Sequence, residues 1–101
     1  MNPSYTITPP ASRDIEKIAD YLAENRSLES SDRFLQGITI KLKCLAQFPK
    51  IGRSRDELSA SLRSLLYENY LIFYRTKANS IEILRVVSGY QDLEIIFDND
   101  E

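Results

Sequence analysis

The chain lacks several residue types on which common catalytic and metal sites depend. It has no histidine and no tryptophan, and Cys44 is its one cysteine in 101 residues. A single cysteine cannot form an internal disulfide, and without histidine the common zinc sites cannot be assembled from the chain's own side chains. Nucleophilic pairs of serine or cysteine with histidine are excluded because the base is missing. We therefore expect no metal or other cofactor, and a protein that works in the reducing cytoplasm.

Long hydrophobic runs are also missing. No stretch approaches the roughly 18 apolar residues of a membrane span, and the N-terminal sequence MNPSYTITPP has no basic start or apolar core of a signal peptide. A net charge of −2 and a pI near 5.2 argue against binding nucleic acid through the overall field, although a local basic patch stays open. We expect neither membrane insertion nor export by that route.

The order of the sequence patterns predicts an α+β fold of the form β-α-α-β-β-β. Residues 4–8 alternate β-formers before Pro9-Pro10, and apolar residues recur at helical spacing over 9–25 and again over about 28–48. Residues 49–62 are rich in turn formers and predict a loop, and three β-rich runs follow at 63–67, 70–76 and 81–88. We expect a single domain over 1–101 in which a helical hairpin packs on one face of a twisted antiparallel sheet. Residues 90–97 suit either a strand or a helix, and 98–101 should be frayed.

The run YLIFYR suggests a strand that is covered on both faces. Alternation places Tyr70, Ile72 and Tyr74 on one face and Leu71, Phe73 and Arg75 on the other. Two helices can cover only one face of so small a sheet, so the second face should serve as an interface for an obligate partner.

Arg85 lies inside a β-rich run, where an unpaired guanidinium would be costly. It should form a structural ion pair with Glu82, Asp92 or Glu94, or contact a partner or RNA. The same two interpretations apply to Arg63 and Arg75. The predicted loop also carries three basic residues, Lys50, Arg53 and Arg55. They should either lie in solvent or bind the phosphate backbone of a nucleic acid.

The tyrosines suit a half-buried sheet, with Tyr90 as the exception because it follows the last strand. Metal-independent ribonuclease chemistry needs a base, a phosphate-binding cation and an acid. The residues available for it are Arg63, Arg85 and Tyr90, although nothing in their spacing demands it.

Four segments together closely resemble the ParE branch of the RelE/ParE toxin superfamily, the toxins of type II toxin–antitoxin and plasmid-stabilisation modules. The segments are DIEKIADYLAEN, FLQGITIKLKCLAQFPKIGRSRDEL, LRSLLYENYLIFYR and IEILRVVSGYQDLE, which span about residues 4–97 in order. The resemblance implies a bacterial toxin that is neutralised by a cognate antitoxin in a hetero-oligomer, which contacts DNA mainly through the antitoxin. ParE-like toxins poison DNA gyrase, whereas RelE-like toxins cleave messenger RNA in the ribosome.

Two departures from the superfamily pattern decide between these targets. The usual ending resembles HGxRD, but this chain has Ser88-Gly89-Tyr90-Gln91-Asp92, and Leu71 stands where RelE-like nucleases have a cation. The loss of both charges disfavours phosphate cleavage. A gyrase inhibitor that acts by binding is therefore the first hypothesis. A ribosome-dependent mRNA endoribonuclease and an inactive homologue that serves antitoxin binding and autoregulation are the alternatives. The expected partner-binding residues are Arg63, Tyr70, Tyr74, Arg75, Arg85, Tyr90, Gln91 and Asp92.

Overall fold

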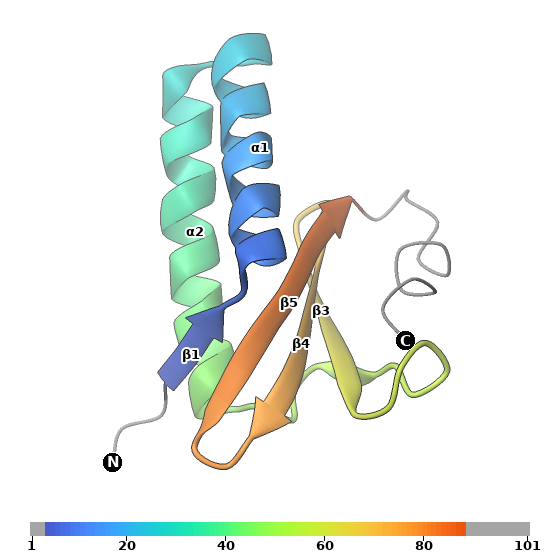
Figure 1. The fold of residues 1–101 in the computed structure, drawn as a ribbon. Coiled ribbons are helices and arrows are strands. Elements are labelled where there is room, and N and C mark those ends of the chain that lie inside the picture. The colour runs from blue at the N-terminus through green and yellow to red at the C-terminus, as the bar shows by residue number, and fades with distance from the viewer. Residues whose placement is uncertain (1–3, 89–101) are drawn as a thin grey trace.

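The fold was analysed in a computed structural model, which describes residues 4–88. Two helices stand side by side against a five-stranded sheet, and the strands fan out beneath them (Figure 1). None of the helices in this described part is long and apolar enough to cross a membrane. The elements, in chain order, are β1 Ser4–Ile7, α1 Pro9–Asn25, α2 Leu28–Gln47, β2 Arg53–Ser54, β3 Leu62–Tyr67, β4 Tyr70–Lys77 and β5 Ser80–Ser88.

The predicted α+β architecture is confirmed, but the sheet is mixed rather than antiparallel. Its strand order is β1-β5-β4-β3-β2, and β1 runs parallel to β5 with Ser4 opposite Ser80 and Ile7 opposite Ile83. Parallel neighbours need a long connection, which the helices and the other strands provide here. Within the predicted loop, Arg53 and Ser54 form the short strand β2 along β3.

Thr8 joins the sheet to the first helix. β1 ends there because Pro9 has no N–H to continue the ladder. The Thr8 N–H donates to the Ile83 carbonyl at 3.1 Å, and its hydroxyl donates to the same carbonyl at 2.8 Å. The hydroxyl oxygen also accepts from the Ala11 N–H at 3.4 Å and so caps α1. The residue that follows the strand therefore fixes where the helix starts.

The main core lies between the helices and the sheet. Phe34, Leu42 and Leu45 of α2 are at most 2% exposed, and Ile72 and Tyr74 of β4 are fully buried beneath the helices. The two helices are also linked directly, because the buried Ser31 hydroxyl donates to the Ala19 carbonyl at 2.8 Å. The predicted alternation along β4 thus places Ile72 and Tyr74 on the helix side.

The opposite face of the sheet carries a second, smaller core. Leu62, Phe73 and Val87 form it and are at most 3% exposed, with Leu58 packed against them. The chain itself buries these side chains. The expectation that a partner must cover this face is therefore wrong for the centre of the face. On β3, Leu66 is 63% exposed.

A bulge in β5 brings Arg85 to the first helix. Phe73 pairs with Arg85 but the next residue, Tyr74, pairs with Ile83, so β5 carries one extra residue at this point. Asp14 of α1 accepts from Arg85 Nε at 2.7 Å and from its terminal nitrogen at 3.1 Å. The same carboxylate accepts from the Val86 N–H at 3.0 Å.

The expected ion pair of Arg85 therefore exists, and Asp14 is a partner that the sequence did not predict. Glu82 instead pairs with Lys77 at 3.4 Å, and Asp92 and Glu94 lie outside the described residues. The pairing of Arg85 with Asp92 or Glu94 stays a prediction. Asp14 is 71 positions away in the sequence, so it could not be identified from neighbours along the strand.

Asp14→Ala should destabilise the fold strongly, because it removes the acceptor of Arg85 and Val86 from a site where the Asp14 side chain is only 15% exposed. We expect a loss of about 2–4 kcal/mol in the free energy of unfolding, measured by denaturant titration. Glu29→Ala is the matched control, because the Arg33–Glu29 pair has side chains 72% and 81% exposed. It should change the unfolding free energy by less than about 0.5 kcal/mol. Equal losses in both variants would contradict the assigned role of Asp14.

Candidate functional site

The arginines predicted as site residues each bind a different part of the same chain. A terminal nitrogen of Arg63 donates to the Gly52 carbonyl at 2.7 Å and to the Lys50 carbonyl at 3.4 Å. Arg75 donates to the Ser59 hydroxyl at 3.1 Å, and Arg85 binds α1. The sheet therefore does not direct these guanidinium groups toward one point.

Tyr74 is a structural residue, which corrects its assignment to partner binding. Its side chain is fully buried, and its hydroxyl donates to the Pro49 carbonyl at 2.7 Å and accepts from the Gly52 N–H at 2.9 Å. A side chain at position 52 would overlap the Tyr74 hydroxyl and approach the Ser64 carbonyl, so the close approach requires glycine. Burial raises the pKa of Tyr74, while the hydrogen bond from Gly52 and the charge of Arg63 oppose the shift.

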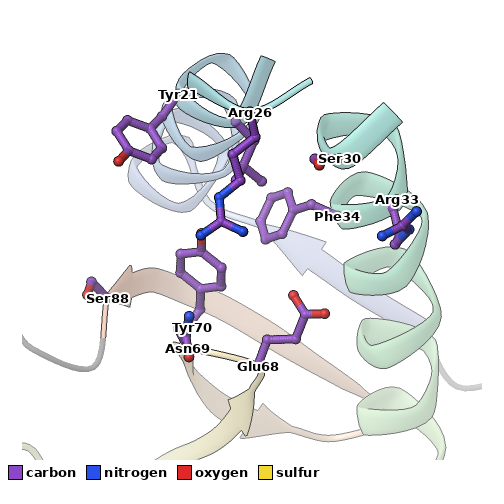
Figure 2. A pocket seen from close by; sticks show the side chains of 10 residues that line it. Tyr21, Arg26, Ser30, Arg33, Phe34, Glu68, Asn69, Tyr70 and Ser88 are labelled. Atoms are coloured by element: carbon purple, nitrogen blue, oxygen red, sulfur yellow. The ribbon is translucent and has the colours of Figure 1, made fainter. Parts of the chain in front are cut away.

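A pocket lies at the N-terminal end of α2, between the connection that joins the two helices and the β3–β4 turn. Its volume is about 300 Å³. Figure 2 shows Arg26 reaching from the connection between the helices toward Tyr70, while Glu68 extends from the turn below Phe34. The lining residues are Tyr21, Leu22, Arg26, Ser30, Arg33, Phe34, Glu68, Asn69, Tyr70 and Ser88.

Aromatic contacts form the floor of this pocket. The rings of Phe34 and Tyr70 meet edge to face, with centroids 5.2 Å apart at 62°. Tyr67 contacts Phe34 at a centroid distance of 6.3 Å and lies so close to Gly37 that any side chain there would overlap its hydroxyl. The helix and the β3–β4 hairpin are thus packed at a fixed distance.

Charges of both signs surround Tyr70. Burial raises the pKa of Tyr70, the nearby Glu68 carboxylate adds to this, and the Arg26 guanidinium lowers the pKa in opposition. Glu68 has a backbone φ of 54°, a left-handed conformation that is unfavourable for most residues other than glycine. The turn thus holds a carboxylate at the pocket at some cost in backbone strain.

The sequence interpretation identified only part of this arrangement. Tyr70 was predicted as a partner-binding residue and does line the pocket, but Arg26, Phe34 and Glu68 were missed. They come from three separate elements, so no local spacing relates them. Tyr90, Gln91 and Asp92 lie outside the described residues, and their predicted roles stay predictions.

Comparison with known proteins identifies the family. Residues 5–93 match the family model for the ParE toxin of type II toxin-antitoxin system, parDE. The chain belongs to the ParE toxin family.

Individual relatives agree with this assignment over most of the chain. Toxin ParE3 of Caulobacter vibrioides is 28% identical over 86 residues, which are 85% of this chain and 86% of the relative. Toxin ParE1 of Mycobacterium tuberculosis is 26% identical over 95 residues, covering 93% and 97% of the two chains. A chain of the chromosomal ParDE toxin–antitoxin system from P. aeruginosa superimposes with a TM-score of 0.73 at 26% identity, over 84% of this chain and 94% of that one. The chain is thus a ParE-family toxin of a type II toxin–antitoxin system.

Replacement of Tyr74 by Phe should destabilise the toxin, since it removes the partner of both the Pro49 carbonyl and the Gly52 N–H. We expect a loss of about 1–3 kcal/mol in unfolding free energy near neutral pH, whereas Tyr21→Phe, at a side chain 60% exposed, should have almost no effect.

Alkaline pH provides an independent measurement on the same residue. The unfolded tyrosine titrates near 10.0 and the folded Tyr74 titrates higher, so between these values the folded state binds more protons. The stability due to this shift is complete below about pH 10 and is lost as pH rises further. Denaturant titrations across that range should therefore show a shallower alkaline loss in Tyr74→Phe than in the wild type. An identical alkaline loss would refute the buried state of this phenol.

Proposed function

We propose that this ParE-family toxin acts in the cytoplasm by binding and inhibiting DNA gyrase, and that a cognate antitoxin neutralises it by binding. The observation that carries the proposal is the use of the sheet arginines as internal structural links. A toxin whose Arg63, Arg75 and Arg85 are bound to different parts of the chain is better suited to binding than to cleaving a phosphodiester.

The alternative ribonuclease mechanism requires cations that meet at the scissile phosphate. Arg63 is bound by the turn carbonyls beside β3, whereas Arg85 is bound by Asp14 of α1 near the other edge of the sheet. Leu71, at the position where RelE-like nucleases have a cation, packs against the second core. This arrangement argues against the nuclease and supports the inhibitor.

The pocket beside the connection between the two helices is the proposed anchor site for the antitoxin. Tyr and Arg side chains dominate the energetics of protein interfaces, and Tyr70, Tyr21 and Arg26 supply both types here. Arg26 forms no ion pair within residues 4–88, so its charge is available to an acidic group. We therefore propose that an acidic side chain of the antitoxin, followed by an apolar one, occupies this pocket.

Purified toxin should inhibit gyrase supercoiling of relaxed plasmid, and its induction should arrest growth and produce double-strand breaks in DNA. The antitoxin should abolish both effects when it is added in equimolar amount. Unchanged supercoiling, together with new messenger RNA ends after induction, would overturn the gyrase assignment in favour of the ribonuclease. An Arg85→Gln variant should arrest growth as the wild type does when equal amounts of folded toxin are compared, because Arg85 has a structural role in this mechanism.

Arg26→Glu should weaken the toxin–antitoxin complex roughly tenfold or more, because it places a carboxylate where we expect an acidic group of the antitoxin. The equilibrium dissociation constant can be measured by calorimetry. Arg13→Glu, which reverses an exposed arginine of α1 outside the pocket, is the matched control and should leave this constant nearly unchanged. Equal weakening by both variants would show a general charge effect and remove the pocket from the interface.

A further inference from the structure

The turn that follows α2 exposes two large apolar side chains. Phe48 is 57% exposed and Ile51 is 51% exposed, and the Ile51 N–H donates to the Phe48 carbonyl at 3.2 Å, which closes the turn. Lys50 lies between them in sequence and Arg53 follows, both exposed. Adjacent exposed apolar residues are typical of interaction surfaces, whereas isolated ones need no explanation.

Buried residues of the sheet hold this turn in one conformation. The Tyr74 hydroxyl binds both Pro49 and Gly52, and Arg63 binds the Gly52 carbonyl at 2.7 Å. The absence of a side chain at Gly52 allows the turn to lie directly on Tyr74. The backbone that carries Phe48 and Ile51 is therefore already fixed before a partner binds, which lowers the conformational entropy lost on binding.

The turn is also locally positive, although the chain carries a net charge of −2. Neither Lys50 nor Arg53 forms an ion pair within the part of the chain that the structure describes. The nearest acidic residues in sequence are engaged elsewhere. Asp56 accepts from the Ser54 hydroxyl at 3.1 Å and from the Ser61 N–H at 3.0 Å, and Glu57 pairs with Arg55 at 3.4 Å.

We infer that this turn is the surface with which the toxin binds its protein target, and that the target offers an apolar cleft with an acidic rim. The cleft would accept Phe48 and Ile51, and the rim would pair with Lys50 and Arg53. A nucleic acid strand would satisfy the two cations but would leave Ile51 in water, so a protein surface fits better.

The position of the turn separates it from the proposed antitoxin anchor. The pocket lies at the N-terminal end of α2 and the turn at its C-terminal end (Figure 1). A helix of 20 residues spans about 30 Å, so one side chain of an antitoxin cannot occupy both places. The inference rests on the proposed function, because it assigns a second surface to the toxin's target.

Two variants test the inference: Phe48→Ser/Ile51→Ser removes the apolar contacts, and Lys50→Glu/Arg53→Glu reverses the charges. Ile40→Ser/Leu66→Ser is the control, because these side chains are 69% and 63% exposed elsewhere. Each full-length variant is measured for growth arrest on induction, for gyrase binding by surface plasmon resonance, and for the antitoxin dissociation constant. Thermal unfolding and the sedimentation coefficient show whether each variant is folded and what its oligomeric state is.

Both turn variants should bind gyrase at least roughly tenfold more weakly and arrest growth correspondingly less, with unfolding and antitoxin binding unchanged. The control should behave as the wild type in every assay. Wild-type growth arrest and wild-type gyrase binding by the turn variants would overturn the inference. It would also be overturned if they lost antitoxin affinity equally, or if the loss followed a change in self-association.

An error in the gyrase assignment can be distinguished from an error in the assignment of the turn. If the wild-type toxin arrests growth but does not bind gyrase, the gyrase assignment is wrong. The turn is then judged by growth arrest alone. Reduced arrest in both turn variants, but not in the control, supports the inference for the actual target, and unchanged arrest overturns it.

Discussion

The carboxylate of Asp14 is the interaction on which the arrangement of this toxin depends. β5 lies between β1 and β4, but β1 ends at Ile7, opposite Ile83, so no strand within residues 4–88 lies beside the rest of that edge of β5. Thr8 satisfies the Ile83 carbonyl, and Asp14 satisfies the Val86 N–H together with Arg85. Buried backbone N–H and C=O groups without hydrogen-bond partners would cost free energy of folding. α1 and the residue before it are therefore held where Asp14 and Thr8 can act as these partners. The bulge in β5 turns Arg85 toward the helix and completes the contact.

This attachment also determines which surfaces are available for function. With α1 fixed on β5, and α2 linked to α1 through Ser31, the connected end of the hairpin lies over the β3–β4 turn and forms the pocket. At the other end of α2, Tyr74 and Arg63 fix the turn that exposes Phe48. Within residues 4–88, the polar side chains of the sheet thus shape two surfaces. This organisation supports the proposal that the toxin acts by binding.

The sequence was sufficient to predict the elements and the faces of the strands. The helices were expected over 9–25 and about 28–48, and they occupy Pro9–Asn25 and Leu28–Gln47, because capping residues and Pro49 give local signals for their ends. Alternation correctly assigned Ile72 and Tyr74 to one face of the sheet and Phe73 to the other. The sequence motifs also indicated the ParE family, which the family match over residues 5–93 confirms.

Contacts between distant elements could not be predicted in the same way. Periodicity tells which face a residue occupies but not which residue it meets there, so the Asp14–Arg85 pair and the parallel β1–β5 pair were missed. Tyr74 was interpreted as a partner contact because tyrosine suits a sheet rim, and nothing local showed that Pro49 and Gly52 bind its hydroxyl. The pocket requires α1, α2 and a hairpin to meet, which only the tertiary structure specifies.

The most direct test of the central claim removes the charge of the pair while keeping its hydrogen-bonding groups. In Asp14→Asn/Arg85→Gln the amide groups can still join α1 to β5, but no cation remains at position 85. Growth arrest is then measured in cells that contain equal amounts of folded variant and wild type. The structural role of the pair predicts that arrest persists at the wild-type level with only a moderate loss of thermal stability. A folded double variant that no longer arrests growth would contradict it and would return Arg85 to the active machinery of the toxin.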